Sequence, residues 1–312
     1  MMIKNRLLLT GVTGFLGSHL TKSLLSLGCE IVAIKRKSSS LHRVESLHKD
    51  IIFFDDEIDF DVLFKKCAKI DAIIHTATCY GRNGESVTEI FEANTEFPLR
   101  LLDAGNRAGV GLFINTDTIL DKYLNLYALS KNQLLQWGRF FAMHEKIRFI
   151  NIRLEHFYGA DDEATKFSAY VFNSCLSNLP ELKLTKGAQK RDFIHIDDVV
   201  SAYVTILEKV GGFDVTDSSR VCQNFTSELN FPPYFSEFDV GSGQSVSIKE
   251  FVETVHRLTG SKTNLEFGSL PYRDGEVMFS EADITGLVAL GWKCHYDIET
   301  GLKKVVDEMK RL

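Results

Sequence analysis

Tyr127 and Lys131, in the segment Tyr127-Ala-Leu-Ser-Lys131, have residue types and a spacing that suit proton transfer. Residues four apart lie on one face of a helix, so both side chains can reach the same substrate. A phenol in water loses its proton near pH ~10, and an ammonium group beside it favours the phenolate and lowers that pKa. Such a pair can give a proton to a carbonyl oxygen while hydride reaches the carbonyl carbon. Taken alone, the spacing is also common on ordinary solvated helix faces.

A glycine-rich segment near the N-terminus is suited to hold a hydride carrier. An apolar run at 3–9 leads into Thr10-Gly-Val-Thr-Gly-Phe-Leu-Gly17 and then a helical pattern. This order of strand, glycines and helix is typical of a dinucleotide site, where the pyrophosphate lies at the helix N-terminus. A plain glycine turn is the alternative. The predicted contacts are Gly11, Thr13, Gly14, Phe15, Leu16 and Gly17.

The end of the second predicted strand, 30–34, indicates which dinucleotide is bound. It is followed by Lys35-Arg36-Lys37-Ser38, with no acidic residue. An acid here would bind the ribose 2′-hydroxyl of NAD, whereas basic residues suit the 2′-phosphate of NADP. We therefore predict a preference for NADP(H), with NAD(H) possible and with Arg36 and Ser38 as contacts. The alternative is a solvated basic patch.

Three further strand ends carry candidate side chains. Asp55 follows the strand at 51–54, where an acid can bind the adenine amino group or cap a helix. A loop of small residues, 76–80, follows the strand at 71–75. Thr116 follows the strand at 112–115 and could hydrogen-bond the carbonyl oxygen that Tyr127 protonates. The other predicted dinucleotide contacts are Thr76, Ala77, Thr78 and Asn94, together with Tyr127 and Lys131 themselves.

The strand and helix patterns predict an α/β fold. Six strands, the last at 148–153, alternate with helices, as in a doubly wound parallel (Rossmann) sheet. Between 87 and 108 lies a long helical pattern that Pro98 should break. We expect residues 1–155 to form the NADP-binding domain, with 192–210 returning to it. We expect 156–191 and 211–312 to form a smaller α/β substrate lobe, in which 211–237 is a surface loop and 237–240 a strand.

Composition excludes several partners. The chain has 312 residues, 44% of them hydrophobic and 25% charged, which suits a folded soluble protein. Its net charge of -6 argues against nucleic acid. Six cysteines without a C-x-x-C pair indicate free thiols in a reducing compartment rather than disulfides or zinc, so we expect no metal. No stretch approaches the ~20 apolar residues of a membrane helix, so we expect no membrane partner and a cytoplasmic location.

Four motifs accompany the glycine loop and the Tyr127–Lys131 pair. They are Asn115-Thr-Asp-Thr118, Arg153-Leu-Glu-His-Phe-Tyr-Gly159, Arg191-Asp-Phe-Ile-His-Ile-Asp-Asp198 and Arg273-Asp-Gly-Glu276. With them the chain resembles, over nearly its whole length, the extended short-chain dehydrogenase/reductase family that acts on nucleotide sugars. The resemblance implies that Tyr127 is the acid and that Lys131 lowers its pKa and holds the nicotinamide ribose. It also implies that Thr116 orients the carbonyl.

Within that family, the motifs resemble those of the CDP-abequose/CDP-paratose synthase-type 4-ketosugar reductases. The resemblance implies NADPH-dependent reduction of the C4 ketone of a CDP- or dTDP-linked 4-keto-6-deoxy sugar, in deoxysugar biosynthesis for the O-antigen of lipopolysaccharide. Arg191 and Arg273 match arginines that bind the nucleotide-sugar diphosphate, for which guanidinium geometry is suited. The expected substrate contacts are Tyr80, Thr116, Thr118, Glu155, His156, Lys166, Arg191 and Arg273.

Two departures from related enzymes bear on the activity. The related 4,6-dehydratases carry glutamate after Thr-Asp, where this chain has Thr118, and a threonine cannot do general acid work at neutral pH. This argues against dehydratase activity. The segment from Thr116 to Tyr127 is shorter than is usual and contains Tyr123, although only Tyr127 has a lysine four residues on.

Alternative functions remain open at this point. A 4-epimerase would oxidise and re-reduce C4 while retaining NAD, and a non-catalytic dinucleotide-sensing protein could share the fold. The resemblance also suggests a homodimer, with the helices near 87–108 and 127–144 of two chains forming a four-helix bundle. The sequence does not specify the nucleotide base, the C4 stereochemistry, or a hexose rather than a heptose.

Overall fold

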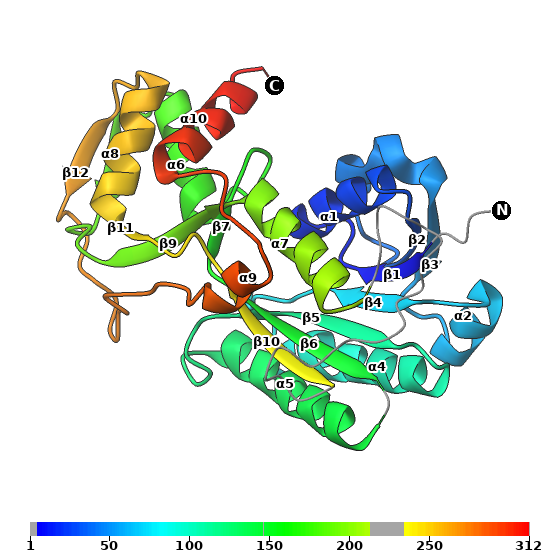
Figure 1. Ribbon diagram of the computed structural model, residues 1–312. Coiled ribbons are helices and arrows are strands. Elements are labelled where there is room, and N and C mark those ends of the chain that lie inside the picture. The colour runs from blue at the N-terminus through cyan, green and yellow to red at the C-terminus, as the bar shows by residue number, and fades with distance from the viewer. Residues whose placement is uncertain (1–4, 146, 213–233, 312) are drawn as a thin grey trace. The chain divides into compact units, whose positions relative to one another are not determined.

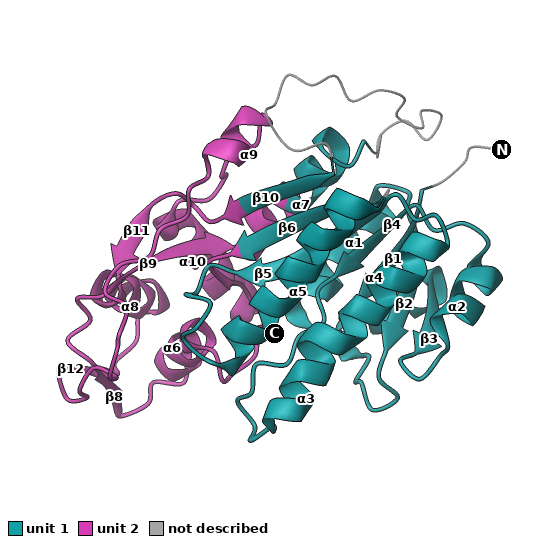
Figure 2. Ribbon diagram, turned by 90° about the horizontal axis from the view of Figure 1, so that it is seen from below, with its two compact units in different colours: residues 1–153, 203–238 teal, residues 154–202, 239–312 magenta. Residues whose placement is uncertain are grey.

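The computed structural model describes residues 5–145, 147–212 and 234–311. Internal contacts divide the chain into two units, coloured separately in Figure 2. Unit 1 comprises Met1–Arg153 and Tyr203–Phe238, and unit 2 comprises Leu154–Ala202 and Asp239–Leu312. Both units therefore contain two separate stretches of the chain. The predicted loop at 211–237 falls largely on 213–233, outside the described residues.

Unit 1 is built on a seven-stranded sheet with the order β10-β6-β5-β4-β1-β2-β3. The predicted Rossmann-like parallel sheet is confirmed, because β1 pairs in parallel with β2 and β4, and β4 with β5. This order brings the carboxyl ends of β1, β4 and β5 together. The strands are β1 (Arg6–Thr10), β2 (Glu30–Lys35), β3 (Ile51–Asp55), β4 (Ala72–His75), β5 (Leu112–Thr118), β6 (Arg148–Leu154) and β10 (Phe235–Val240).

Two strands of this sheet differ from the prediction. The strand predicted at 237–240 was assigned to the smaller lobe, but as β10 it is the seventh strand of the main sheet, beside β6. The Phe149 N–H donates to the Tyr234 carbonyl at 2.7 Å just before β10 begins. β5 continues to Thr118, three residues beyond its predicted end, because its polar residues find buried partners. Thr116 and Thr118 therefore lie on a strand rather than in a loop.

Helices cover both faces of the unit 1 sheet (Figure 1). α1 (Phe15–Ser26) and α7 (Ile196–Lys209) lie along one face, whereas α4 (Phe97–Arg107) and α5 (Leu126–His144) lie along the other. The 3₁₀ segment His42–Asp50 leads into β3, and α2 (Phe60–Cys67) follows it. The core on the second face combines apolar side chains of the central strands with those of α2, α4 and α5, among them Leu8, Ile73, Leu63, Leu101, Phe113, Phe141 and Phe149.

The helix predicted at 87–108 stays helical to Arg107 but changes locally to a π-helical turn just before Pro98. α3 (Val87–Phe91) begins at a Ser86–Glu89 capping box, and a π-helical turn, Glu92–Glu96, separates it from α4. Pro98 lies at the start of α4, where its missing N–H costs least. The wider turn places Asn94 in the interior, fully buried. π-turns within helices are frequent at functional sites.

Among its described residues, unit 2 contains two small sheets, four whole helices and the first half of α7, up to Ala202. A three-stranded sheet has the order β11-β9-β7, and β8 pairs in parallel with β12. Phe251 packs at the centre of its core, stacked on Phe193. The elements are β7 (His156–Tyr158), α6 (Phe167–Leu176), β8 (Glu181–Leu184), β9 (Lys190–His195), β11 (Ser245–Ser247), α8 (Ile248–Thr259), β12 (Asn264–Phe267), α9 (Thr285–Ala289) and α10 (Ile298–Met309).

Candidate active site

The first turns of α5 carry the Tyr127–Lys131 pair. Asn125 caps the helix by accepting a hydrogen bond from the Ala128 N–H at 2.9 Å, which fixes where α5 starts. Lys131 is only 2% exposed, and its Nζ donates to the Thr116 carbonyl at 3.0 Å. The Tyr127 ring packs against Tyr80 with ring centroids 5.1 Å apart. Tyr123, in contrast, is 81% exposed.

The expected lowering of the Tyr127 pKa is not found in the chain alone. Burial raises the pKa of Tyr127 well above its ordinary value, and the nearby Tyr80 and Asp117 add to this effect. A hydrogen bond with the Thr118 side chain opposes the rise, but burial dominates. Burial also lowers the pKa of Lys131 to about 8. Tyr127 is thus held as a neutral phenol, a form that can donate a proton but cannot readily accept one.

The two threonine hydroxyls at the end of β5 have different partners. The Thr116 Oγ1 lies 2.7 Å from the hydroxyl of Tyr203, on α7. Thr118 hydrogen-bonds Tyr127, and its Oγ1 accepts from the Leu120 N–H at 3.3 Å. Thr116 was predicted to orient the carbonyl and Thr118 to contact the substrate. The structure brings the Thr118 side chain to Tyr127 and joins the Thr116 side chain to Tyr203.

Alternate residues of β5 form a buried polar network. Asn151 accepts from Asn115 at 2.8 Å and donates to Asp117 at 2.9 Å. Lys122 then binds both the Asp117 carboxylate at 2.8 Å and the Thr118 carbonyl at 2.9 Å. Because Lys122 lies in the short segment between β5 and α5, this ion pair fixes the segment to the strand that precedes it.

The glycine loop fits a dinucleotide pyrophosphate. Gly11 has φ +76°, and a Cβ there would lie 2.6 Å from the Ala77 nitrogen. A Cβ on Gly17 would lie 2.0 Å from the Gly11 carbonyl oxygen, so α1 can approach the loop only with glycine at that position. Gly14 is the N-cap of α1 and provides no side-chain cap. The first-turn N–H groups of Phe15 and its neighbours can therefore receive a phosphate.

The loop at 76–80 is fixed by β1 and by the buried Asn94. Thr76 Oγ1 donates to the Thr10 carbonyl at 2.8 Å. Asn94 accepts from the Cys79 N–H at 2.7 Å and donates to the Cys79 carbonyl at 2.8 Å. Thr78 also donates to Asn94, at 3.3 Å. In the chain alone, the predicted dinucleotide contact Asn94 thus uses its amide to hold the loop.

At the end of β2, two of the three basic residues are paired with acidic side chains. Lys35 pairs with Asp55 at 3.1 Å, and Lys37 pairs with Glu57 at 2.5 Å. Arg36 and Ser38, the two predicted 2′-phosphate contacts, are exposed. The predicted adenine contact Asp55 uses its carboxylate on Lys35, and α2 is capped by Asp59 instead.

The charged residues predicted to bind substrate from unit 2 are mostly ion-paired. Arg191, 9% exposed, binds Glu276 at 2.7 Å. Lys166 binds the buried Asp162 at 2.9 Å. Glu155 and His156 contact each other, with His156 Nδ1 2.9 Å from the buried Glu155, whose other oxygen meets the Ser280 hydroxyl. The fifth predicted residue, Arg273, is exposed.

Sequence reasoning missed three residues that hold predicted site residues. They are Tyr203, Lys122 and Glu276, which contact Thr116, Thr118 and Arg191. Glu276 lay within the Arg273-Asp-Gly-Glu motif, so its position offered a signal. Tyr203 offered none, because an aromatic residue on an amphipathic helix is normally a core residue.

The described residues lack the features of two other kinds of site. No group of three or more His, Cys, Asp or Glu side chains in this part of the chain could hold a metal ion. Within the same residues, no helix has both the length and the apolar character needed to cross a membrane.

Comparison with known proteins defines the class of protein. Residues 7–216 match the NAD dependent epimerase/dehydratase family. The chain belongs to this family and is an extended short-chain dehydrogenase/reductase.

Particular relatives extend the comparison to the whole chain. The chain is 33% identical to CDP-abequose synthase of Salmonella muenchen, over 97% of this chain and 98% of that protein. It is equally similar to CDP-abequose synthase of Salmonella typhimurium, over 99% of both chains. It is 24% identical to ADP-L-glycero-D-manno-heptose-6-epimerase of Brachyspira hyodysenteriae, over 98% of both chains.

Solved structures share the fold. UDP-glucose 4-epimerase of Thermotoga maritima, in complex with UDP-glucose, aligns with a TM-score of 0.79 at 19% identity, over 98% of this chain and 99% of that one. UDP-glucuronic acid 4-epimerase of Bacillus cereus, in complex with UDP-glucuronic acid and NAD, also gives 0.79, at 21% identity and the same coverage. At such identities the likeness concerns the fold alone.

Proposed function

We propose that the protein is an NADPH-dependent reductase of the C4 ketone of a nucleotide-linked 4-keto-6-deoxy sugar, with CDP or dTDP as the nucleotide. When bound, the dinucleotide supplies hydride. Tyr127 gives its proton to the C4 oxygen, so that the ketone becomes a secondary alcohol. Lys131 holds the strand end through the Thr116 carbonyl, and Thr116 steadies the substrate oxygen.

The observation that carries this proposal is the similarity to CDP-abequose synthases over nearly the whole chain. Tyr127 carries its proton at neutral pH, as the acid of a reduction must.

The preference for NADPH rests on Arg36 and Ser38. Both are exposed at the end of β2, and Lys35 and Lys37 on either side of Arg36 are already ion-paired. A guanidinium group suits a phosphate, and no acidic side chain follows β2 directly to repel one.

A 4-epimerase is the second candidate function, because residues 7–216 match the NAD dependent epimerase/dehydratase family. Such an enzyme would retain NAD and return it unchanged. The two functions therefore differ in what the purified protein contains and in whether it consumes NADPH.

The proposed function is tested by mixing the protein with NADPH and a panel of CDP- and dTDP-linked 4-keto sugars. We expect loss of the NADPH absorbance with at least one sugar, and NMR of the product should show a new C4 proton. Tightly bound NAD with interconversion of 4-hydroxy sugars and no NADPH consumption would instead establish an epimerase. No turnover in either assay would favour a dinucleotide-sensing protein.

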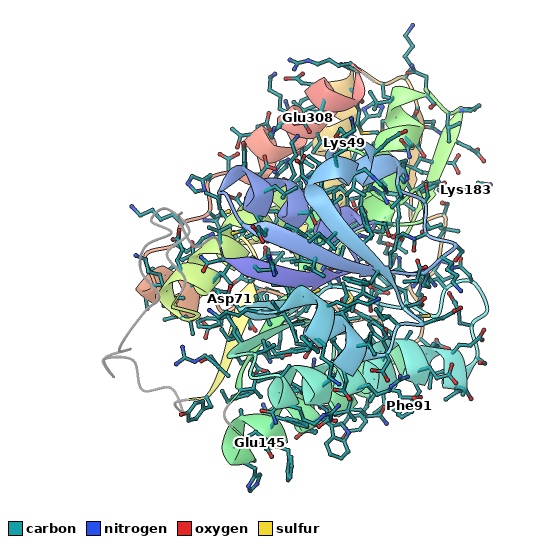
Figure 3. All side chains as sticks on the ribbon, turned by 90° about the vertical axis from the view of Figure 1, so that its right-hand side faces the viewer. Lys49, Asp71, Phe91, Glu145, Lys183 and Glu308 are labelled. Carbon is teal, nitrogen blue, oxygen red and sulfur yellow. The ribbon has the colours of Figure 1, made fainter. Side chains whose placement is uncertain are left out.

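We also propose that two copies form a dimer through α3 and α5. Both helices expose large apolar side chains, among them Val87, Phe91, Trp137, Phe140 and Met143. Phe91, labelled in Figure 3, lies at the outer side of the helical layer. Four helices, two from each copy, would cover these side chains, and monomeric proteins rarely leave so many exposed together.

Light scattering tests the dimer. The parent should have about twice the 35.2 kDa mass of one chain, and Phe140→Glu should give the single-chain mass. Tyr170→Glu, at a similarly exposed aromatic residue of unit 2, should leave the mass unchanged. A monomeric parent at micromolar concentration would contradict the proposal.

We also propose a cytoplasmic location, which the free state of the five described cysteines suits.

A further inference from the structure

Thr116 is held from both faces of the unit 1 sheet. Lys131, on α5, donates to its carbonyl at 3.0 Å, and Tyr203, on α7, meets its side-chain hydroxyl at 2.7 Å. Tyr203 is 2% exposed. None of the four sequence motifs includes Tyr203, which lies beyond the segment that ends at Asp198.

Chemistry fixes the direction of the bond between these hydroxyls. A phenol is the stronger donor, and an aliphatic hydroxyl is the better acceptor. Burial raises the pKa of Tyr203 further, so the phenol keeps its proton throughout the neutral range. Tyr203 therefore donates to Thr116 Oγ1. The single proton of Thr116 then remains available for a second acceptor, and a hydroxyl that accepts one hydrogen bond becomes a better donor in the next.

We propose that Tyr203 is a positioning residue that directs the Thr116 hydroxyl proton toward the substrate ketone oxygen. This inference rests on the proposed function, because it needs a carbonyl oxygen in the site. Without the Tyr203 hydroxyl, the Thr116 side chain would lose its fixed donor, and its proton would have no preferred direction. Tyr203 touches neither the substrate nor the dinucleotide in this scheme and acts only through Thr116.

The experiment compares Tyr203→Phe, Thr116→Val and the double variant, with Tyr170→Phe as an exposed control. Thr116→Val should lower kcat by about 10²-fold, the loss typical of one removed donor to a developing oxyanion. Tyr203→Phe should lower kcat by about 10-fold and leave the Kd for NADPH, measured by its fluorescence, unchanged. In the Thr116→Val background, Tyr203→Phe should have no further effect on kcat. Tyr170→Phe should behave as the parent.

A readout without turnover separates this inference from the proposed function. With the oxidised dinucleotide present, binding of the keto-sugar nucleotide should weaken about threefold in each single variant and no further in the double variant. Full additivity of the two changes, in kcat or in this affinity, would overturn the role of Tyr203. So would a Tyr203→Phe variant that matches the parent in both. If the parent itself consumes no NADPH with any keto sugar, the proposed function fails instead, whatever the variants do.

Discussion

The predicted site residues of unit 1 and unit 2 are held by different kinds of interaction. In unit 1, Asp55 is ion-paired to Lys35, but hydrogen bonds to neutral groups hold the residues nearer Tyr127: Lys131 binds the Thr116 carbonyl, and Asn94 binds the Cys79 backbone. In unit 2, carboxylates hold them, since Arg191 binds Glu276 and Lys166 binds Asp162. A site of the first kind is preorganised for chemistry. A site of the second kind must exchange protein carboxylates for the substrate's own charges.

The largest expected effect tests the neutral site of unit 1. Tyr127→Phe should reduce turnover by about 10²-fold or more, because the ketone oxygen loses its proton donor. The Kd for NADPH, measured by fluorescence, should not change. Tyr123→Phe is the matched control, since Tyr123 lies four residues earlier and is exposed, and it should keep parental turnover. Equal activity of Tyr127→Phe and the parent would remove that residue from the mechanism.

The next effect tests the ion-paired residues of unit 2. Arg191→Met should raise the KM for the nucleotide sugar by about 30-fold, the value of a charge-assisted hydrogen bond, and change kcat much less. Arg257→Met is the control, because Arg257 is also ion-paired, to Glu299, but is exposed. It should leave KM unchanged. If Arg191→Met lowered kcat and did not raise KM, the distinction between the two units would not hold.

A smaller effect concerns the choice of dinucleotide. Arg36→Ala should lower the preference for NADPH over NADH, as a ratio of kcat/KM values, by about tenfold, because the 2′-phosphate loses a guanidinium partner. Lys37→Ala removes a neighbouring positive charge that Glu57 already neutralises, and should change the ratio by less than about twofold. Equal losses in the two variants would indicate a general charge effect.

Local patterns in the sequence were sufficient to predict the fold, but they predicted the site less completely. The apolar runs and the glycine loop predicted six strands of the main sheet, because buried parallel strands are nearly continuous in apolar residues. They missed the end of β5, where Asp117 looks like a loop residue until Asn151 supplies its partner. They also placed β10 in the wrong sheet, since its pairing with β6 joins segments more than 80 residues apart.

The environment of a side chain was harder to predict than its position. The spacing of Tyr127 and Lys131 indicated their place on one helix, but an argument from charge alone left out burial, which raises the Tyr127 pKa in the chain alone. Burial decided that direction, and burial depends on residues such as Tyr80 that are distant in sequence. The same holds for Tyr203, whose role appears only once α7 lies against the end of β5.

The last expected effect is a gain in stability. Burial lowers the pKa of Lys131 from 10.5 to about 8, so below pH ~8 the folded chain carries a buried ammonium that the unfolded chain holds more easily. The shift corresponds to about 3 kcal/mol, and loss of the hydrogen bond to Thr116 offsets about 1 kcal/mol of it. Lys131→Met should therefore be inactive yet more stable than the parent at pH 7, by about 2 kcal/mol in urea unfolding.

The pH dependence of that gain identifies its cause. Between pH ~8 and ~10.5 the unfolded chain binds the Lys131 proton and the folded chain does not, so this group makes the parent more stable as pH rises. The advantage of Lys131→Met should therefore disappear by pH ~10, whereas the exposed Lys249→Met should follow the parent throughout. An advantage that stays constant with pH would mean that packing of the methionine, and not relief of a buried charge, stabilises the variant. In that case the buried Lys131 ammonium would not lower the free energy of unfolding of the parent.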